Sequence, residues 1–162
     1  MPSFRDTDHL LSRGRDEEEP EEHHRVVVID DDATIRDSLA FLLSDHYDVS
    51  TYRSAKEGVT AITEDVCAVV LDVKMPGHDG FWACNEIRKR VPNMPVIFYS
   101  AYQNLKDPYA IINDHRPFGY VAKGDDVHRL LDMLKAAVEL QSMIVANQRL
   151  LRALKDHQGA AP

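Results

Sequence analysis

Charged residues directly follow short apolar runs at three separate places in this chain. These are Asp30 after residues 26–29, Asp72 after residues 69–71, and Lys123 after residues 120–122. Apolar runs of this length are typical of strands buried on both faces of a sheet. Because parallel strands end at one edge of a sheet, we expect these charges to meet there. Carboxylates and an ammonium group gathered in this way can bind a divalent metal and a phosphoryl group.

Strand and helix patterns alternate along most of the chain. The expected strands are residues 25–30, 47–52, 66–71, 95–99 and 118–122, and the expected helices are residues 34–44, 54–64, 80–90, 108–115 and the stretch from 126 onward. Ser54 and Glu57 form a capping box, and Asp79 is placed to cap the third helix. Five strand–helix units predict an α/β fold with a parallel sheet covered on both faces.

The final helix is unusually long, because no helix breaker occurs between Asp126 and Gly159. Its residues at alternating steps of three and four are Leu130, Met133, Ala137, Leu140, Ile144, Asn147, Leu151 and Leu154. This is a heptad seam, and the domain can cover only about its first four turns. We expect the rest to form a homodimeric parallel coiled coil, with contact to a partner protein, folding back on the domain, and fraying as alternatives.

Charge and composition divide the chain into three parts. Residues 1–24 hold eight acids and three arginines, so they carry −5 of the net charge of −8 and predict a disordered acidic tail. Residues 25–138 form the expected domain, and residues 139–158 form a helical, coiled-coil-like extension. The body is nearly balanced in charge and has no basic stripe, so we expect no direct nucleic-acid binding.

No apolar stretch approaches the roughly 18 residues needed to span a bilayer, so we expect no membrane partner. The two cysteines, Cys67 and Cys84, have no metal-type spacing. A reduced, cytoplasmic protein is the simplest interpretation of this composition.

Together these motifs resemble the receiver domain of two-component response regulators, over about residues 25–140. The matching segments are VVVIDDD at 26–32, LDVKMPGHDG at 71–80, FYSA at 98–101 and GYVAK at 119–123. The resemblance implies a flavodoxin-like, doubly wound sheet of five parallel strands in the order 2-1-3-4-5, extended by the C-terminal helix. It also implies a signalling domain rather than an enzyme.

The resemblance assigns a role to each matched acid. Asp72 would accept a phosphoryl group from a histidine kinase or a phosphotransfer protein. Asp31, Asp72 and the backbone carbonyl of Lys74 would bind Mg²⁺, with Asp30 holding a coordinated water or lying just behind the ion. Asp32, the third acid of the triplet, is expected to cap the first helix instead.

The resemblance also implies a switch. Lys123 and Ser100 would contact the phosphoryl group on the acceptor. Ser100 would then move inward and Tyr120 would turn into the space behind it. The face built from the fourth helix, the fifth strand and the final helix would report the change, which would reach the dimer through the long helix.

One position departs from the family pattern. Gly124 follows Lys123, where the family usually has a proline in a cis bond. The resemblance therefore leaves the placement of Lys123 open.

Several function classes remain to be weighed. The leading hypothesis is a receiver without an output domain of its own, and the alternative is a receiver cut from a longer regulator whose effector is missing. A Mg²⁺-dependent phosphohydrolase with an aspartyl-phosphate intermediate is less favoured, because the residues that should follow an Asp-x-Asp nucleophile do not follow Asp30. A scaffold that is not phosphorylated is disfavoured by the intact set Asp31, Asp72, Ser100 and Lys123.

Overall fold

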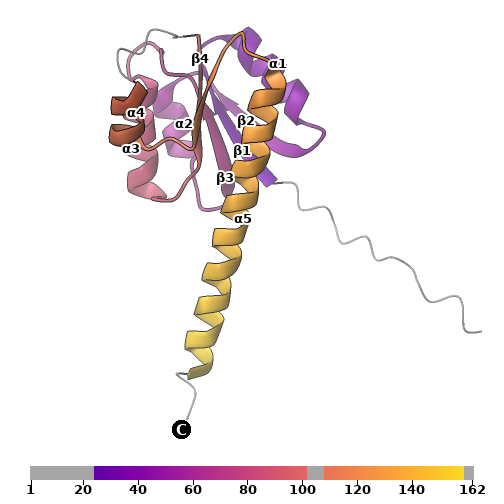
Figure 1. Cartoon of the computed structure of the whole chain (residues 1–162), viewed down its shortest axis with the longest axis vertical. Helices are drawn as coiled ribbons and strands as arrows, with labels where there is room; N and C mark the ends of the chain where they lie inside the picture. The colour runs from indigo at the N-terminus through magenta and orange to yellow at the C-terminus, as the bar shows by residue number, and fades with distance from the viewer. Residues whose placement is uncertain (1–23, 102–107, 159–162) are drawn as a thin grey trace, which may run out of the picture.

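A single parallel sheet of five strands runs through the computed structural model, which describes residues 24–101 and 108–158 (Figure 1). The strands are β1 (His24–Ile29), β2 (Tyr47–Tyr52), β3 (Val66–Leu71), β4 (Val96–Ser100) and β5 (Gly119–Ala122). Their order in the sheet is β2-β1-β3-β4-β5, and every neighbouring pair is parallel. The expected fold class and strand order are therefore confirmed.

Helices cover both faces of this sheet. They are α1 (Ala33–Leu43), α2 (Ala55–Ala61), α3 (Gly80–Arg90), α4 (Pro108–His115) and α5 (Val127–Gln158). Helices α2 and α3 pack on one face, and α1 and the first half of α5 pack on the other. The doubly wound arrangement leaves the carboxyl ends of all five strands at one edge of the molecule.

The two faces of β1 show how the core is divided. Val27 and Ile29 are buried on the side of α2 and α3, whereas Val26 and Val28 are buried on the side of α1 and α5. This follows from the alternation of side chains along a strand, because an all-apolar strand can fill two cores only when both faces are covered.

The helices begin where the polar residues of the sequence predicted. The side chain of Asp32 accepts a hydrogen bond from the Thr34 amide at 2.8 Å, and that of Asp79 accepts one from the Trp82 amide at 2.8 Å. Each cap satisfies an amide that the first helical turn leaves without a partner. The helix expected at 54–64 ends earlier, at Ala61, because the next residue, Ile62, becomes extended and buries its side chain.

Helix α5 is 32 residues long and continues well past the sheet (Figure 1). Leu130 and Ala137 of the expected seam are fully buried against the domain, so they are not available to a partner. Packing on the domain extends to Gln141, and every side chain from 146 to 157 is exposed. The exposed large apolar residues of this helix are Leu140, Met143, Leu150, Leu151 and Leu154.

The acidic tail expected at residues 1–24 lies outside the described residues, apart from His24, which is the first residue of β1. Across the described ranges, no helix combines the length and apolar character that crossing a bilayer requires.

Candidate functional site

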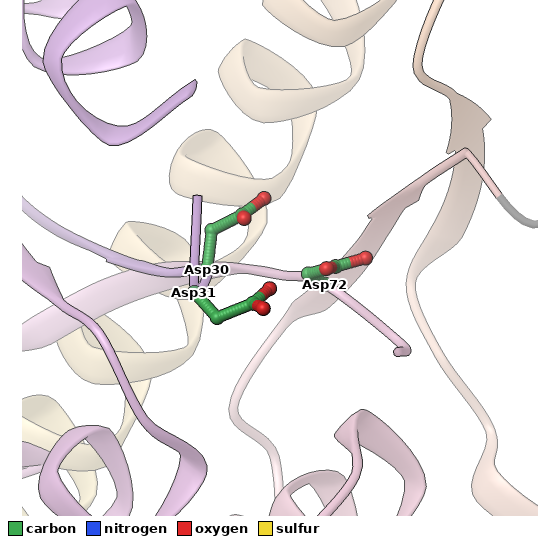
Figure 2. Close-up of side chains that lie close together, drawn as sticks. All are labelled: Asp30, Asp31 and Asp72. Carbon is green, nitrogen blue, oxygen red and sulfur yellow. The ribbon is translucent and has the colours of Figure 1, made fainter. Parts of the chain in front are cut away.

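Three carboxylates meet at the carboxyl edge of the two central strands. Asp30, Asp31 and Asp72 each offer an oxygen that lies within 4.8 Å of the other two. Figure 2 shows their side chains projecting on the same side of the strand ends. Asp30 and Asp72 are buried, with 2% and 5% of their surface exposed, while Asp31 is exposed to solvent. Carboxylate oxygens are the ligands that Mg²⁺ prefers, so this donor set fits such an ion.

Strand register explains why these acids meet. Ile29 of β1 lies opposite Leu71 of β3, so the next residue of each strand leaves the sheet at the same level. The backbone amide of Asp72 donates to the carbonyl of Ile29 at 2.9 Å, which ties the two strand ends together. Asp32, two residues beyond Asp30, serves as the cap of α1, and it does not belong to the cluster.

Lys123 brings a positive charge to the same edge. Its Nζ lies 2.6 Å from Oδ2 of Asp30 and 3.4 Å from Oδ2 of Asp72. Burial lowers the pKa of Lys123, but the hydrogen bond and charge of Asp30, followed by the charge of Asp72, outweigh that effect and raise the pKa above its ordinary value. The ammonium group is therefore firmly protonated beside both buried carboxylates.

Both oxygens of the Asp30 side chain are already engaged. Oδ1 accepts a hydrogen bond from the Asp32 amide at 2.9 Å, and Oδ2 contacts Lys123. Burial nevertheless raises the pKa of Asp30, with a contribution from the charge of Asp72, and the hydrogen bonds only partly oppose it. Ionised Asp30 is thus held at a cost to the fold.

Arg36 is a residue of this site that the sequence analysis missed. Its Nη1 donates to the backbone carbonyl of Asp30 at 2.8 Å, from the second turn of α1. This contact fixes the bend that carries Asp30 and Asp31 away from β1. A possible signal is the spacing, since an arginine four residues after the capping Asp32 lies one helical turn above it.

The loop after Asp72 depends on a very close approach of the chain to itself. Gly80, the first residue of α3, donates its amide to the carbonyl of Val73 at 2.8 Å. A Cβ on Gly80 would lie 2.2 Å from the backbone oxygen of Asp72, so only glycine fits there. Lys74 has an exposed side chain on this loop, whereas Met75 is buried in the core and anchors it.

Ser100 and Tyr120 lie on the β4 and β5 side of the cluster. Ser100 is 1% exposed at the end of β4, and its carbonyl accepts a hydrogen bond from the Lys123 amide at 2.9 Å. The hydroxyl of Tyr120 donates to the same carbonyl at 3.4 Å. Burial raises the pKa of Tyr120, and the negative charges of Asp72 and Asp125 add to the effect. The backbone of Ser100 thus joins the lysine and the tyrosine.

The bond between Lys123 and Gly124 is trans, since the described residues contain no cis peptide. Gly124 has a φ of 112°, which L side chains rarely adopt. The chain therefore turns after β5 through glycine rather than through a cis proline, and it still delivers Lys123 to the carboxylates.

A family model for the response regulator receiver domain matches residues 26–135. The chain therefore belongs to the response regulator receiver family, and it is a receiver domain of the two-component kind. Phosphorylation and a requirement for Mg²⁺ are general properties of that family, and the acidic cluster agrees with them.

Curated relatives share this domain. The chain is 28% identical over 108 residues to the C4-dicarboxylate transport transcriptional regulatory protein DctD of Rhizobium meliloti (strain 1021), covering 66% of this chain and 23% of DctD. It is 34% identical over 119 residues to the transcriptional regulatory protein TdiR of Thauera aromatica, covering 72% of this chain and 52% of TdiR. The chain thus spans about a quarter to a half of these relatives.

A solved structure supports the same assignment. The response regulator receiver domain protein from Clostridium thermocellum has a TM-score of 0.68 and 29% identity, and the match covers 74% of this chain and 98% of that one. That structure is almost wholly a receiver domain, so the match covers a whole fold.

Proposed function

We propose that this chain is a phosphoacceptor and that Asp72 is the residue that takes the phosphoryl group from a histidine kinase or a phosphotransfer protein. The observation that carries this proposal is the position of Asp72, buried at a strand end with two carboxylates within 4.8 Å and an ammonium group at 3.4 Å. As a bond forms between the Asp72 carboxylate and phosphorus, the donor's P–N bond breaks and the histidine nitrogen leaves.

Asp31, Asp72 and the backbone carbonyl of Lys74 would hold Mg²⁺ in this proposal. Asp30 would lie just behind the ion, because the Asp32 amide and Lys123 already engage its two oxygens. When bound, the ion orients the acceptor and offsets the charge of the transferring group. The chain's own contribution is a fixed acceptor carboxylate and a positive charge beside it.

Lys123 would serve as the counter-charge of the phosphoryl group. Its Nζ lies between the two buried carboxylates, so a small movement from Asp30 toward Asp72 brings it to the oxygens of a group on Asp72. Ser100 lies at the end of β4, where it pairs with Ala122, the residue before Lys123. Its buried hydroxyl would supply a hydrogen bond to the same group.

The switch would run through β4 and β5. The Ser100 carbonyl accepts hydrogen bonds from both Lys123 and Tyr120. A movement of Ser100 or Lys123 would therefore displace the hydrogen-bond partner of Tyr120. Tyr120 is half-buried against the core, and its ring would turn inward in this switch. The result would be a change on the face formed by α4, β5 and α5.

The C-terminal half of α5 would pair with a second copy of the chain. Leu140, Leu151 and Leu154 are 43–58% exposed on one side of the helix, and Asn147 lies between them. Apolar residues at this spacing gain free energy by entering a parallel coiled coil, and one asparagine in the seam can fix its register. We propose domain limits of residues 25–138, followed by a helical extension at residues 139–158.

We propose a role for this chain in the receiver step alone. The curated relatives are transcriptional regulators, and the larger part of DctD and about half of TdiR lie outside the match. We propose no effector activity for this chain on that basis. The two free cysteines support a reducing cytoplasm as its location.

Intact-mass measurement tests the acceptor directly. With a small phosphodonor and Mg²⁺, we expect one phosphoryl adduct on the wild type and none on Asp72→Asn. Asp32→Asn is the matched control, since Asp32 caps α1 outside the cluster, and it should keep the adduct. An equal adduct on Asp72→Asn would place the acceptor elsewhere, and rapid release of phosphate with turnover would favour the phosphohydrolase alternative.

Solution size tests the dimer. We expect Leu151→Glu to shift the protein toward monomer, whereas Ala153→Glu, an equally exposed change on another side of α5, should leave the size unchanged. Both measurements are repeated with the phosphate mimic beryllium fluoride. A wild-type monomer under both conditions would remove the coiled coil from the proposal.

A further inference from the structure

The exposed half of α5 carries a basic face as well as an apolar one. Arg149, Arg152 and Lys155 are exposed there, against a single carboxylate, Asp156. Within the part of the chain that the structure describes, none of the three cations has a carboxylate at ion-pair distance. This face therefore has uncompensated positive charge in a protein whose net charge is −8.

The basic face continues the side of α5 that packs on the domain. Arg152 follows Gln141, the last buried residue of the helix, by eleven residues, which is about three turns. The arginines thus extend the packed side of the helix beyond the edge of the sheet, whereas Leu151 and Leu154 lie on a different side. Dimerisation through the apolar seam would leave the basic face free.

The N-terminal end of β1 lies beside α5 (Figure 1). His24 and Arg149 line the same cleft, together with Val145 and Ala146 of the helix. His24, the first described residue, therefore lies next to the first of the three cations.

That preceding segment has the opposite charge. Residues 16–22 contain six acids and no base, and they are separated from His24 by a single residue. We propose that this acidic segment binds the basic face of α5 in the same chain. The inference is independent of phosphorylation and of the role given to Asp72.

Length favours this pairing. Seven extended residues span about 23 Å, while the rise from Arg149 to Lys155 along the helix is about 9 Å. The segment can therefore contact all three cations without stretching. Because it is joined to β1 a few residues away, its effective concentration at the helix is high, and weak exposed ion pairs can act together.

Charges on the sheet side direct the segment toward the helix. The cleft is also lined by the carboxylates of Asp48, Glu64 and Asp65, of which Asp65 is paired with Arg25 at 2.9 Å. These acids repel an acidic segment, so the energetically favourable path leads away from the sheet and along α5.

Carbodiimide cross-linking of the full chain tests the proposal, because the reagent joins a carboxylate to a neighbouring lysine amine through an amide. We expect mass spectrometry to find Lys155 linked to residues 16–22, with a yield that falls sharply in high salt. Lys56 is the control lysine, since it is exposed on α2, on the opposite face of the sheet. It should give no such link.

A double substitution tests whether the two arginines take part in binding the acidic segment. Arg149→Gln with Arg152→Gln keeps Lys155 and good helix formers in place, and we expect the yield to fall about fivefold as two exposed ion pairs are lost. Circular dichroism checks that α5 is still helical. An unchanged yield in this variant, or no link in the wild type at low salt, would overturn the proposal.

Mixing isotope-labelled and unlabelled chains separates two arrangements. Links within one isotope class support binding in the same chain. Links of mixed class would show that the tail reaches a second copy, and they would overturn the same-chain assignment. Because Asp72→Asn leaves all of these charges unchanged, that variant should cross-link like the wild type even if the acceptor assignment fails.

Discussion

Nζ of Lys123 lies closer to Asp30 than to Asp72, at 2.6 Å against 3.4 Å. The lysine is therefore held mainly by Asp30, which lies beside the proposed metal position, and only secondarily by the proposed acceptor. A cation at this place opposes the binding of a second cation, and it is also ready to meet a phosphoryl group. One residue thus affects two steps in opposite directions.

Lys123→Met should bind Mg²⁺ more tightly and accept phosphoryl less readily. Removal of the ammonium group takes a competing charge from the two buried carboxylates, which we expect to raise Mg²⁺ affinity about tenfold. Calorimetric titration measures this affinity, and intact mass measures the adduct. Lys56→Met is the matched control, because it removes an equal charge from an exposed side chain of α2, away from the carboxylate cluster. Equal affinities in the two variants would contradict the competition.

Asp30 should give the metal-free protein an unusual dependence on pH. Burial raises the pKa of Asp30 above its ordinary 3.8, so the folded state holds this proton more tightly than the unfolded chain does. The free energy of unfolding therefore declines as pH rises from 3.8 through the raised pKa. Asp30→Asn should lack that decline in urea unfolding measured with a chelator present.

A second carboxylate provides the contrast in sign. A hydrogen bond from Thr63 and then one from Arg25 lower the pKa of Asp65, so it stabilises the fold above pH 3.8 and loses that contribution as pH falls through its lowered pKa. Asp65→Asn should therefore differ from the wild type in the direction opposite to Asp30→Asn. Parallel curves for all three proteins would show that neither carboxylate titrates as described.

Gly80→Ala should destabilise the loop after Asp72 far more than Gly77→Ala does. The new Cβ at 80 would lie 2.2 Å from the backbone oxygen of Asp72, whereas at 77 it would meet nothing within 4 Å and would only strain a φ of 79°. We expect losses in the free energy of unfolding of about 3 and about 1 kcal/mol, respectively. Denaturant unfolding measures both, and similar losses would argue against the close contact.

Gly124→Ala should lower stability by about 1–2 kcal/mol and reduce the phosphoryl adduct, because a φ of 112° strains any L side chain and the relief of that strain moves Lys123. Urea unfolding and intact mass check the two effects. Asp125→Ala, at the next position, loses an ion pair with Arg129 and a negative charge near Tyr120 but keeps the glycine turn, so it serves as the control. A wild-type adduct on Gly124→Ala would show that the turn does not position the lysine.

Much of this architecture follows from local chemistry in the sequence. Residues 66–71 and 80–90 were predicted with the limits that β3 and α3 have, because an apolar run and a capping Asp79 mark them. The meeting of Asp30 and Asp72 followed from strand ends in a parallel sheet. In each case the signal lies within a few residues of the feature that it predicts.

Long-range polar contacts could not be predicted in the same way. The spacing of Arg36 from Asp32 places it one helical turn above the cap, but nothing in the sequence indicates that its side chain reaches the carbonyl of Asp30. The guanidinium of Arg88 donates to the carbonyls of His115 and Arg116, far away in sequence, and no pattern indicates that either. Lys123 was expected at the same sheet edge as the two carboxylates, but its closer contact with Asp30 than with Asp72 could not be predicted. Side-chain reach and backbone dihedrals decide such contacts, and neither can be read from residue order.

The continuity of α5 has a mechanical consequence. The exposed part from 146 to 157 is about 18 Å long and is continuous with the turns that pack on the sheet. A tilt of about 5° at its base would displace the far end by about 1.6 Å, which is a large fraction of the ~4 Å at which apolar side chains are in contact. A stiff lever of this kind converts an angular change too small to disturb the core into a translation that a neighbouring helix can register.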